Sequence, residues 1–274
     1  ATAAYDATIK IWDVKTGECI QTLEGPEGDV EWVAWHKNAD VLLAGSKDAT
    51  VWMWLAPSGK FMQVFAGHED EVTCGTFTGN GKSVVTASLD RTCRVWNPKD
   101  GTCRHQFQGY KWHEAGIVCM DVHPTKPLVV TGALDGSVRL SQLRKGKILH
   151  ALDQEDVTQA IETVAFAKTH DWVSSGGMDG FIDVWDVATG ACRCRFNNEG
   201  HNVVKTQWHP REPLLMSASA DAVVKIWDTR AGSAIAKLTG HADVILAMDS
   251  FVGSDLSYIL TASDDGIIKR FDVP

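Results

Sequence analysis

Short stretches of alternating apolar and polar residues run along the whole chain, and none shows the spacing of about 3.6 residues that marks an amphipathic helix. Alternation of this kind predicts half-buried β-strands. One type of strand begins directly after a turn that contains Asp, as in KDATVWMW, LDRTCRVW and ADAVVKIW. Two β-rich stretches, such as VEWVAW and VLLAGS, precede each strand of this type. Another β-rich stretch, such as CIQTLE, follows it. The pattern therefore predicts units of four short strands.

These units recur seven times with a period of about 43 residues. The third strand of each unit ends at an aromatic residue or at a residue in its place: Trp12, Trp54, Trp96, Ser141, Trp185, Trp227 and Phe271. Six residues before each of these positions there is an Asp: Asp6, Asp48, Asp90, Asp135, Asp179, Asp221 and Asp265. An Asp at a tight turn can accept hydrogen bonds from nearby backbone donors. Four-stranded repeats without helices predict an all-β fold, a β-propeller.

The Gly-His and Trp-Asp pairs of these repeats resemble those of the WD-repeat family. They include Gly67-His68, Gly200-His201, Trp12-Asp13 and Trp227-Asp228. The resemblance covers the whole chain and implies a hydrogen-bonded set of His, Ser or Thr, Asp and Trp inside a blade. It assigns structural roles to His68, Asp90 and Trp96 with Ser88 or Thr86; to His201, Asp221 and Trp227 with Ser217 or Ser219; and to Asp48 and Trp54. Ser141 and the pair Leu152-Asp153 depart from the pattern, so we expect the fourth blade to lack this set.

The domain organisation predicted from the repeats is a single β-propeller over residues 1–274. Seven blades are represented, the first of them incomplete, because the first unit lacks its first strand and the last unit lacks its fourth. WD-repeat rings usually close with an N-terminal strand. We therefore expect a natural N-terminal segment that is absent from this chain.

Composition excludes several classes of protein. Apolar residues make up 44% of the 274 residues, and the net charge of −9 argues against general nucleic-acid binding. Neither an apolar run long enough to span a membrane nor a signal peptide is present. The seven Cys are scattered without paired CxxC spacing, which predicts a reducing compartment and no zinc site. The sequence predicts no cofactor, no metal and no catalytic site, because neither a GxSxG motif nor a phosphate-binding glycine pattern occurs.

The acidic residues are not spread evenly. The loops that join the fourth strand of one unit to the first strand of the next contain twelve Asp and Glu and a single basic residue, Lys111. The resemblance implies that these inter-blade loops lie on the face that binds partners. A concentrated negative field favours a basic ligand, although a modest acidic excess can also serve solubility alone. The acids predicted to bind a partner are Asp29, Glu69, Asp70, Glu71, Glu114, Asp153, Glu155, Asp156 and Asp243, together with Asp264 beside a turn Asp.

Exposed charge pairs contribute little affinity individually, so apolar anchors are expected as well. Tyr5, Leu89 and Met178 each precede a turn Asp, and Trp112 lies in the loop 109–116. Of these, Tyr5 and Trp112 are the predicted partner-binding anchors. Packing within the loop is the alternative interpretation of all four.

A finer resemblance rests on the stretch GDVEWVAWHKNADVLLAGSKDATVWMW, in which Trp52 and Trp54 share one strand. It is similar to the group that holds the angio-associated migratory cell protein and the Sqt-type ribosome-assembly chaperones. This resemblance implies eight blades in the full protein and a basic N-terminal segment of a large-subunit ribosomal protein as partner. The function expected is thus a non-enzymatic, monomeric chaperone of the cytoplasm and also the nucleus, without direct nucleic-acid or membrane contacts. The alternative is a scaffold in signalling or ubiquitin-ligase assembly that binds another protein through the same face.

Overall fold

The computed structural model describes the chain except for residues 155–158, 254–256 and 273–274. Residue contacts divide it into two compact units. Unit 1 comprises Ala1–Thr131 and Ser141–Leu149, and unit 2 comprises Gly132–Leu140 and His150–Pro274. The expectation of a single domain stays a prediction.

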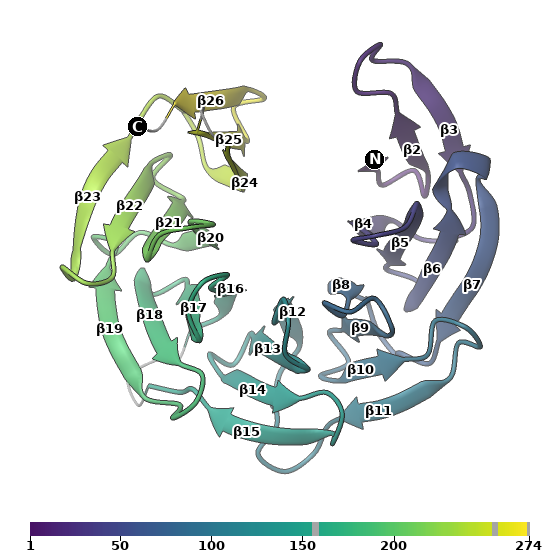
Figure 1. The fold of residues 1–274 in the computed structure, drawn as a ribbon, viewed down its shortest axis with the longest axis horizontal. Coiled ribbons are helices and arrows are strands. Elements are labelled where there is room, and N and C mark those ends of the chain that lie inside the picture. The colour runs from purple at the N-terminus through teal and green to yellow at the C-terminus, as the bar shows by residue number, and fades with distance from the viewer. Residues whose placement is uncertain (155–158, 254–256, 273–274) are drawn as a thin grey trace. The chain divides into compact units, whose positions relative to one another are not determined.

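Among the described residues the strands form seven antiparallel sheets, each with its strands in chain order, and no α-helix (Figure 1). This is the blade architecture of a β-propeller, as the repeat predicts. The first three sheets contain β1 (Thr2–Ala3), β2 (Ile9–Trp12) and β3 (Cys19–Leu23); β4 (Val30–Trp35), β5 (Val41–Ser46), β6 (Thr50–Leu55) and β7 (Lys60–Ala66), with a 3₁₀ turn at Ala56–Ser58; and β8 (Cys74–Phe77), β9 (Val84–Ala87), β10 (Cys93–Trp96) and β11 (Cys103–Phe107).

The remaining four sheets follow the same order. They contain β12 (Ile117–Val122), β13 (Leu128–Ala133), β14 (Val138–Gln142) and β15 (Lys147–Ala151); β16 (Ile161–Phe166), β17 (Trp172–Gly177), β18 (Phe181–Asp186) and β19 (Cys192–Asn197); β20 (Val203–Trp208), β21 (Leu214–Ser219), β22 (Val224–Asp228) and β23 (Ser233–Leu238); and β24 (Ile245–Val252), β25 (Ser257–Ser263) and β26 (Ile268–Asp272).

The second strand of a blade is buried on both faces, as β5, β9 and β21 show. Sequence stretches such as VLLAGS and LLMSAS are apolar or small throughout for this reason. Their side chains pack into clusters that join neighbouring sheets: in unit 1, Leu43, Val51 and Phe65 of the second sheet contact Phe77 and Trp96 of the third. The core therefore lies between blades, and the turns and loops are left at the two ends of the strands.

The turn between the second and third strands explains the fixed position of Asp. In all seven turns the Asp carboxylate accepts a hydrogen bond from the backbone N–H two residues later, at 2.8–3.1 Å. The residue between them has a positive φ, which ranges from 62° at Ala7 to 78° at Gly136. A three-residue hairpin loop needs one residue in this left-handed region, and the carboxylate holds the turn closed around it.

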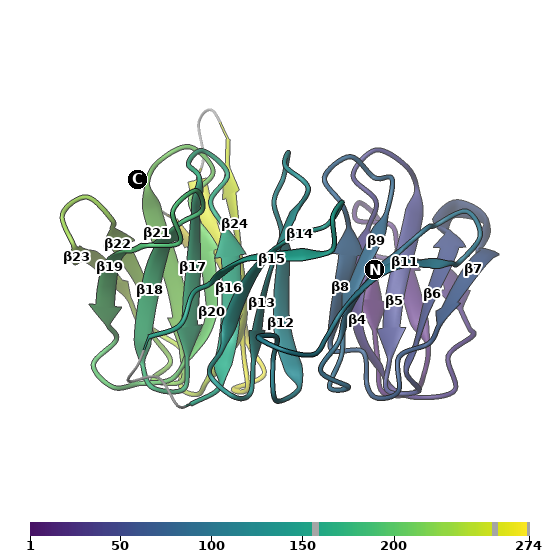
Figure 2. The same ribbon diagram turned by 90° about the horizontal axis from the view of Figure 1, so that it is seen from below.

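Antiparallel order places these Asp turns and the inter-blade loops at the same end of the strands. The turns after first strands and after third strands leave the opposite end (Figure 2). Each blade thus has one end rich in acidic loop residues and another end with a different set of turns.

Candidate partner-binding surface

The set predicted around His68 lies inside the third blade. His68 Nδ1 is 2.8 Å from the Asp90 carboxylate and its Nε2 is 2.7 Å from Thr86 Oγ1, while Trp96 Nε1 donates to the same Thr86 oxygen at 2.8 Å. With the proton on Nδ1, each group in the chain from Trp96 to Asp90 has the donor or acceptor it needs. Thr86, rather than Ser88, is the hydroxyl residue, and Ser88 instead donates to the backbone carbonyl of Asp70 at 2.9 Å. These side chains bond one another inside the blade and so stabilise it.

Burial and hydrogen bonding have opposite effects on the pKa of the Asp90 carboxyl. Burial alone raises the pKa of its carboxyl, but the hydrogen bond and charge of His68, together with bonds from Thr92 and the Glu69 backbone, lower the pKa well below its ordinary range. Asp48 of the second blade behaves similarly, because bonds from Thr50 and the Glu27 backbone outweigh its burial and lower its pKa. Trp54 of that blade is 1% exposed and packs in the core.

The expected set around His201 does not form. His201 is exposed, and Asn198 occupies the buried position instead, donating to Ser219 Oγ at 2.8 Å and to the His201 carbonyl at 3.0 Å. Trp227 still donates to Ser217 Oγ at 2.8 Å, and Asp221 still closes its turn. Asn198, directly after β19, thus takes the place that His68 has in the third blade.

His113 and His241 occupy the position that the repeat assigns to the His of the set. His113 does not follow a Gly, and His241 belongs to a Gly-His pair. His113 Nε2 lies 2.7 Å from Thr131 Oγ1, and His241 bonds Asp265 at 2.8 Å and Thr261 at 2.7 Å. The fourth blade therefore contains a His in this position, although Ser141 leaves its set without the Trp, and Leu152-Asp153 lies in the loop after this blade. His113 precedes its turn Asp by the same 22 residues as His68, a spacing that identifies it even though Trp112 stands where Gly is usual.

In unit 1 three carboxylates surround one lysine. Lys47 Nζ lies 3.1 Å from Asp29, 3.3 Å from Glu31 and 3.7 Å from Glu71, and it sits 5.2 Å from the centre of the Tyr5 ring. The bonds to Asp29 and Glu31 raise the pKa of Lys47. Tyr5 itself is 74% exposed. This surface therefore already holds one ammonium group between carboxylates and an aromatic ring, the geometry expected for a bound basic side chain.

The neighbouring acids extend the same surface. Glu69 and Asp70 are exposed, and Asp70 uses one carboxylate oxygen to accept the Glu71 backbone N–H at 2.8 Å. We call Asp29, Glu31, Glu69, Asp70 and Glu71 the acidic surface of unit 1. Glu114 is exposed at the edge of a polar depression of about 550 Å³ that is also lined by Asp90, Arg91 and Gln108.

Trp112 is not available as an anchor, which corrects the prediction made for it. Its side chain is 3% exposed, its Nε1 donates to the Arg91 carbonyl at 2.8 Å, and its ring stacks on Phe107 at 5.3 Å. The indole packs the loop 109–116 onto its blade. Of the two predicted anchors, the structure leaves Tyr5 exposed and buries Trp112.

The acids of unit 2 differ in their partners. Asp153 is bound by both carboxylate oxygens to Arg139 Nη1, at 2.5 and 2.6 Å, so its charge is compensated within the chain. Asp243 and Asp264 are exposed, whereas Glu155 and Asp156 lie outside the described residues. Another loop acid, Glu199, is bonded to Lys237 at 2.6 Å and pairs with Lys225 at 3.3 Å, and these contacts lower its pKa.

The count of twelve acids against one base therefore overstates the free negative charge. Lys47 and Arg91 lie in the Asp turns, which share this end of the strands with the loops, and Arg139 and Lys225 reach loop acids from third strands. The sequence could have identified these four basic residues by their positions. Lys47 and Arg91 are adjacent to a turn Asp, and Arg139 and Lys225 follow a turn Asp by four residues. Within unit 1, the acidic side chains gather around Glu69, Asp70 and the carboxylates that face Lys47.

Across the residues that the structure describes, no group of three or more His, Cys, Asp or Glu has a geometry suited to a metal ion. Within that same part of the chain, no helix has the length and apolar character needed to cross a membrane.

The successive antiparallel sheets, the Asp-closed turns and the bonded set of His68, Thr86, Trp96 and Asp90 define a WD-repeat β-propeller. Proteins of this class act through protein–protein interactions and are typically non-enzymatic scaffolds.

Family comparisons agree with this class. Residues 17–54 and 59–97 match the family model described as "WD domain, G-beta repeat", and residues 104–274 match "Nucleolar protein 10-like, N-terminal domain". Because the second model covers more than half of the chain, the chain belongs to the WD-repeat β-propellers of the nucleolar protein 10-like family.

Three curated relatives illustrate the similarity. The whole chain aligns with the angio-associated migratory cell protein of Homo sapiens and of Canis lupus familiaris, at 29% identity over 286 residues in each case, and spans 64% of the length of either protein. Pre-mRNA-processing factor 19 of Oryza sativa subsp. japonica is 26% identical over 60% of this chain and 39% of its own length.

Proposed function

We propose that this chain is a dedicated chaperone that captures the basic N-terminal segment of a large-subunit ribosomal protein on the acidic surface of unit 1. The observation that carries the proposal is the position of Lys47 between Asp29, Glu31 and Glu71 and beside Tyr5. A lysine of the chain occupies a site whose chemistry suits a lysine of a ligand. A segment with several basic residues would displace or surround it and would also reach Glu69 and Asp70.

The chemistry of the ligand supports a chaperone. A basic ribosomal segment carries many unpaired cations that bind stray RNA, and acidic residues on a folded surface mask them. Charges on such a surface accelerate association with the correct partner and disfavour acidic competitors. Tyr5 supplies an exposed aromatic ring that can contribute cation–π contacts to Lys or Arg.

Similarity to the nucleolar protein 10-like domain supports a setting in which ribosomes are assembled. We propose that the protein acts in the cytoplasm and also in the nucleus, as a monomer. The chain spans 64% of its relative, the angio-associated migratory cell protein, so the activity of the whole protein belongs to this proposal as well.

A titration of the chain with the basic ribosomal segment at about 0.05 M and 0.3 M salt tests the proposal, because the Debye length falls from about 14 Å to about 6 Å over this range. We expect saturable binding that weakens with salt. The variant Glu69→Lys/Asp70→Lys/Glu71→Lys should fold and lose this binding.

The matched control is Glu18→Lys/Asp40→Lys, which reverses two exposed acids at the opposite end of the strands of unit 1. Binding in this control should be reduced only by the general change in net charge. Absence of binding at low salt would discard the ribosomal partner and favour the scaffold for another protein. A loss in the control that matches its smaller share of the charge change would show that net charge, rather than the acidic surface, determines binding.

A further inference from the structure

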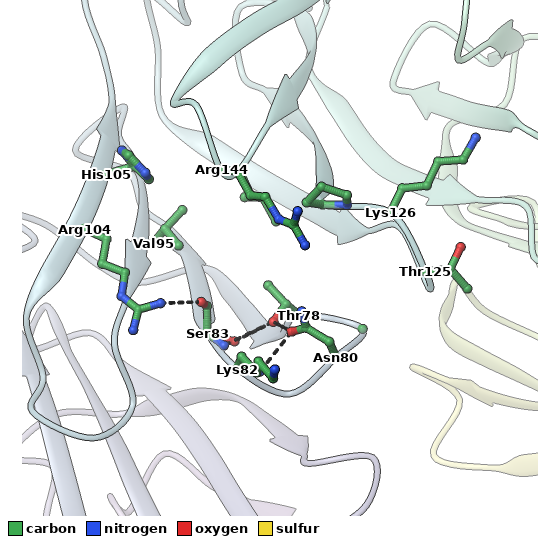
Figure 3. A pocket seen from close by; sticks show the side chains of 13 residues that line it. Thr78, Asn80, Lys82, Ser83, Val95, Arg104, His105, Thr125, Lys126 and Arg144 are labelled. Atoms are coloured by element: carbon green, nitrogen blue, oxygen red, sulfur yellow. Dashed lines mark hydrogen bonds between the residues drawn. The ribbon is translucent and has the colours of Figure 1, made fainter.

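A basic pocket lies at the end of unit 1 opposite the acidic surface. It has a volume of about 330 Å³ and is formed by residues 78–83 after β8, by Arg104 and His105 of β11, by residues 125–127 after β12 and by residues 143 and 144 after β14 (Figure 3). All of these segments are turns or strand ends at the same end of the blades. The pocket is therefore separate from the surface proposed to bind the ribosomal segment.

The charge of this pocket is uniform. Lys82, Arg104, Lys126 and Arg144 line it, and its lining contains neither Asp nor Glu. Within the described part of the chain, Lys82, Arg104 and Arg144 form no ion pair. Asp100 is near Arg104, but its carboxylate is bonded to Thr102 and Asn97; the bond from Thr102 mainly, and the charge of Arg104 in small part, lower its pKa. A chain with a net charge of −9 thus gathers four cations around one hollow.

The neutral groups of the pocket hold its shape. Ser83 N–H donates to Thr78 Oγ1 at 3.1 Å, Lys82 N–H donates to Asn80 Oδ1 at 3.0 Å, and Arg104 Nη1 donates to Ser83 Oγ at 3.3 Å (Figure 3). The first two bonds close the 78–83 turn, and the third joins Arg104 to it. Figure 3 also shows the Arg144 guanidinium directed towards the turn that carries Thr78 and Asn80. The two guanidinium groups of the lining suit a phosphate, which arginine can bind through two parallel hydrogen bonds.

An apolar pocket lies on the other side of the same turn. It has a volume of about 340 Å³ and is lined by Val41, Met53, Met62, Phe77 and Pro98 together with Gly81. Met62 is 46% exposed, so a ligand can reach it from solvent. Because Phe77 and Gly81 flank the residues that line the basic pocket, one extended peptide can cross the turn and place a side chain in each pocket.

We propose that the two pockets bind a phosphorylated, extended segment of a partner protein, with a phosphoserine or phosphothreonine in the basic pocket and an apolar side chain against Met62. A phosphate dianion matches Lys82, Arg104 and Arg144, which form no ion pair among the described residues, in a lining that contains no carboxylate. The neighbouring apolar pocket suits an apolar side chain of a peptide, whereas a free phosphate ion would make no contact with it. Single-stranded RNA fits less well, because neither pocket offers a stack of exposed aromatic rings and the net charge of the chain is negative.

Fluorescence anisotropy on the intact chain tests this proposal with a panel of nine-residue peptides of Ala and Gly. Each peptide carries a central phosphoserine and one Leu, which is moved through the other positions. For at least one Leu position we expect the phosphorylated peptide to bind about tenfold or more tightly than its unphosphorylated form. Arg104→Ala/Arg144→Ala should remove this difference, and Met62→Asp should remove the preference for Leu while keeping the preference for phosphate.

The matched control is Lys15→Ala/Lys37→Ala, which removes two exposed cations from the same end of unit 1 outside both pockets. Its phosphopeptide affinity should stay within about twofold of the original. Three outcomes would overturn the proposal: equal binding of phosphorylated and unphosphorylated peptides, equal competition by inorganic phosphate and by every phosphopeptide, and tighter binding of a twelve-residue oligouridylate that depends on Arg104 and Arg144. The variants of the acidic surface should leave this binding intact, so failure here and failure of the chaperone proposal are separate results.

Discussion

His68 bonds the Asp90 carboxylate at 2.8 Å, whereas His201, in the equivalent Gly-His pair of a later repeat, is exposed and leaves its buried position to Asn198. The same sequence motif therefore has two structural outcomes. In the later repeat the buried position is taken by an amide, because Asn198 is fully buried and donates to the Ser219 hydroxyl at 2.8 Å.

This difference predicts unequal effects of two identical substitutions. His68→Ala removes the partner of the Thr86 hydroxyl and of Asp90 inside the blade, and we expect a loss of about 2–3 kcal/mol in the free energy of unfolding. His201→Ala changes an exposed side chain and should alter it by less than about 0.5 kcal/mol. Urea denaturation of both variants provides the measurement, and similar losses would contradict the assignment.

Acid should destabilise the last blade through Asp265. The bond from the Ala242 backbone, together with His241, lowers the pKa of this carboxyl to about 2 from its ordinary value of 3.8. A lowered folded-state pKa contributes stability that is complete above the unfolded pKa and is lost as the pH falls from about 5 towards 2. Asp265→Asn should therefore flatten the decline of the urea midpoint between pH 6 and pH 3. Asp264→Asn, at the exposed neighbouring position, is the control and should keep the original slope.

The Asp turns allow a test of backbone strain. Ala222 has φ of +64°, where glycine has no Cβ penalty, so Ala222→Gly should raise stability by about 0.5–1 kcal/mol. Gly266→Ala, with φ of +76° and open space around a new Cβ, should lower it by about 1 kcal/mol. Gly180→Ala should cost more, because its Cβ would lie 2.8 Å from the Gly200 backbone. Thermal unfolding that ranked the three variants otherwise would refute this account.

Removal of Lys47 should strengthen binding of a basic ligand. Lys47→Met leaves Asp29, Glu31 and Glu71 without their internal cation, so we expect several-fold tighter binding of the basic ribosomal segment at low salt. The pairs are exposed, so the free energy of unfolding should change little. Isothermal titration at two salt concentrations measures the effect, with Lys37→Met as the control at the other end of the strands. Weaker binding in Lys47→Met would mean that Lys47 itself contacts the partner.

Substitutions of the two predicted anchors, Trp112 and Tyr5, should affect different properties of the protein: stability for Trp112 and ligand binding for Tyr5. Trp112→Ala removes an indole that is 3% exposed and should cost about 3–5 kcal/mol of stability. Tyr5→Ala should leave stability nearly unchanged and weaken binding of the basic segment, because Tyr5 is 74% exposed beside Lys47. Melting curves and titrations of both variants decide this. A Tyr5→Ala variant with unaltered binding would remove Tyr5 from the proposed surface.

The sequence by itself determined the class of fold, because the repeat is a local pattern. An Asp at a fixed distance before each third-strand end follows from a hairpin turn whose hydrogen bonds involve neighbours in the chain. Apolar second strands follow in the same way from burial on both faces. Such relationships join residues that are close together in the chain, so they can be predicted from the sequence alone.

Only the tertiary structure decided which charges and aromatic rings remain available to a partner. Trp112 turned inward to donate to Arg91, Asp153 was compensated by Arg139, and Lys47 came between three carboxylates from two loops and a strand. The basic pocket likewise joins turns that are far apart in sequence. Each of these contacts depends on distances between atoms of different strands and loops. Charged groups that meet in this way are not separated by a regular number of residues along the chain.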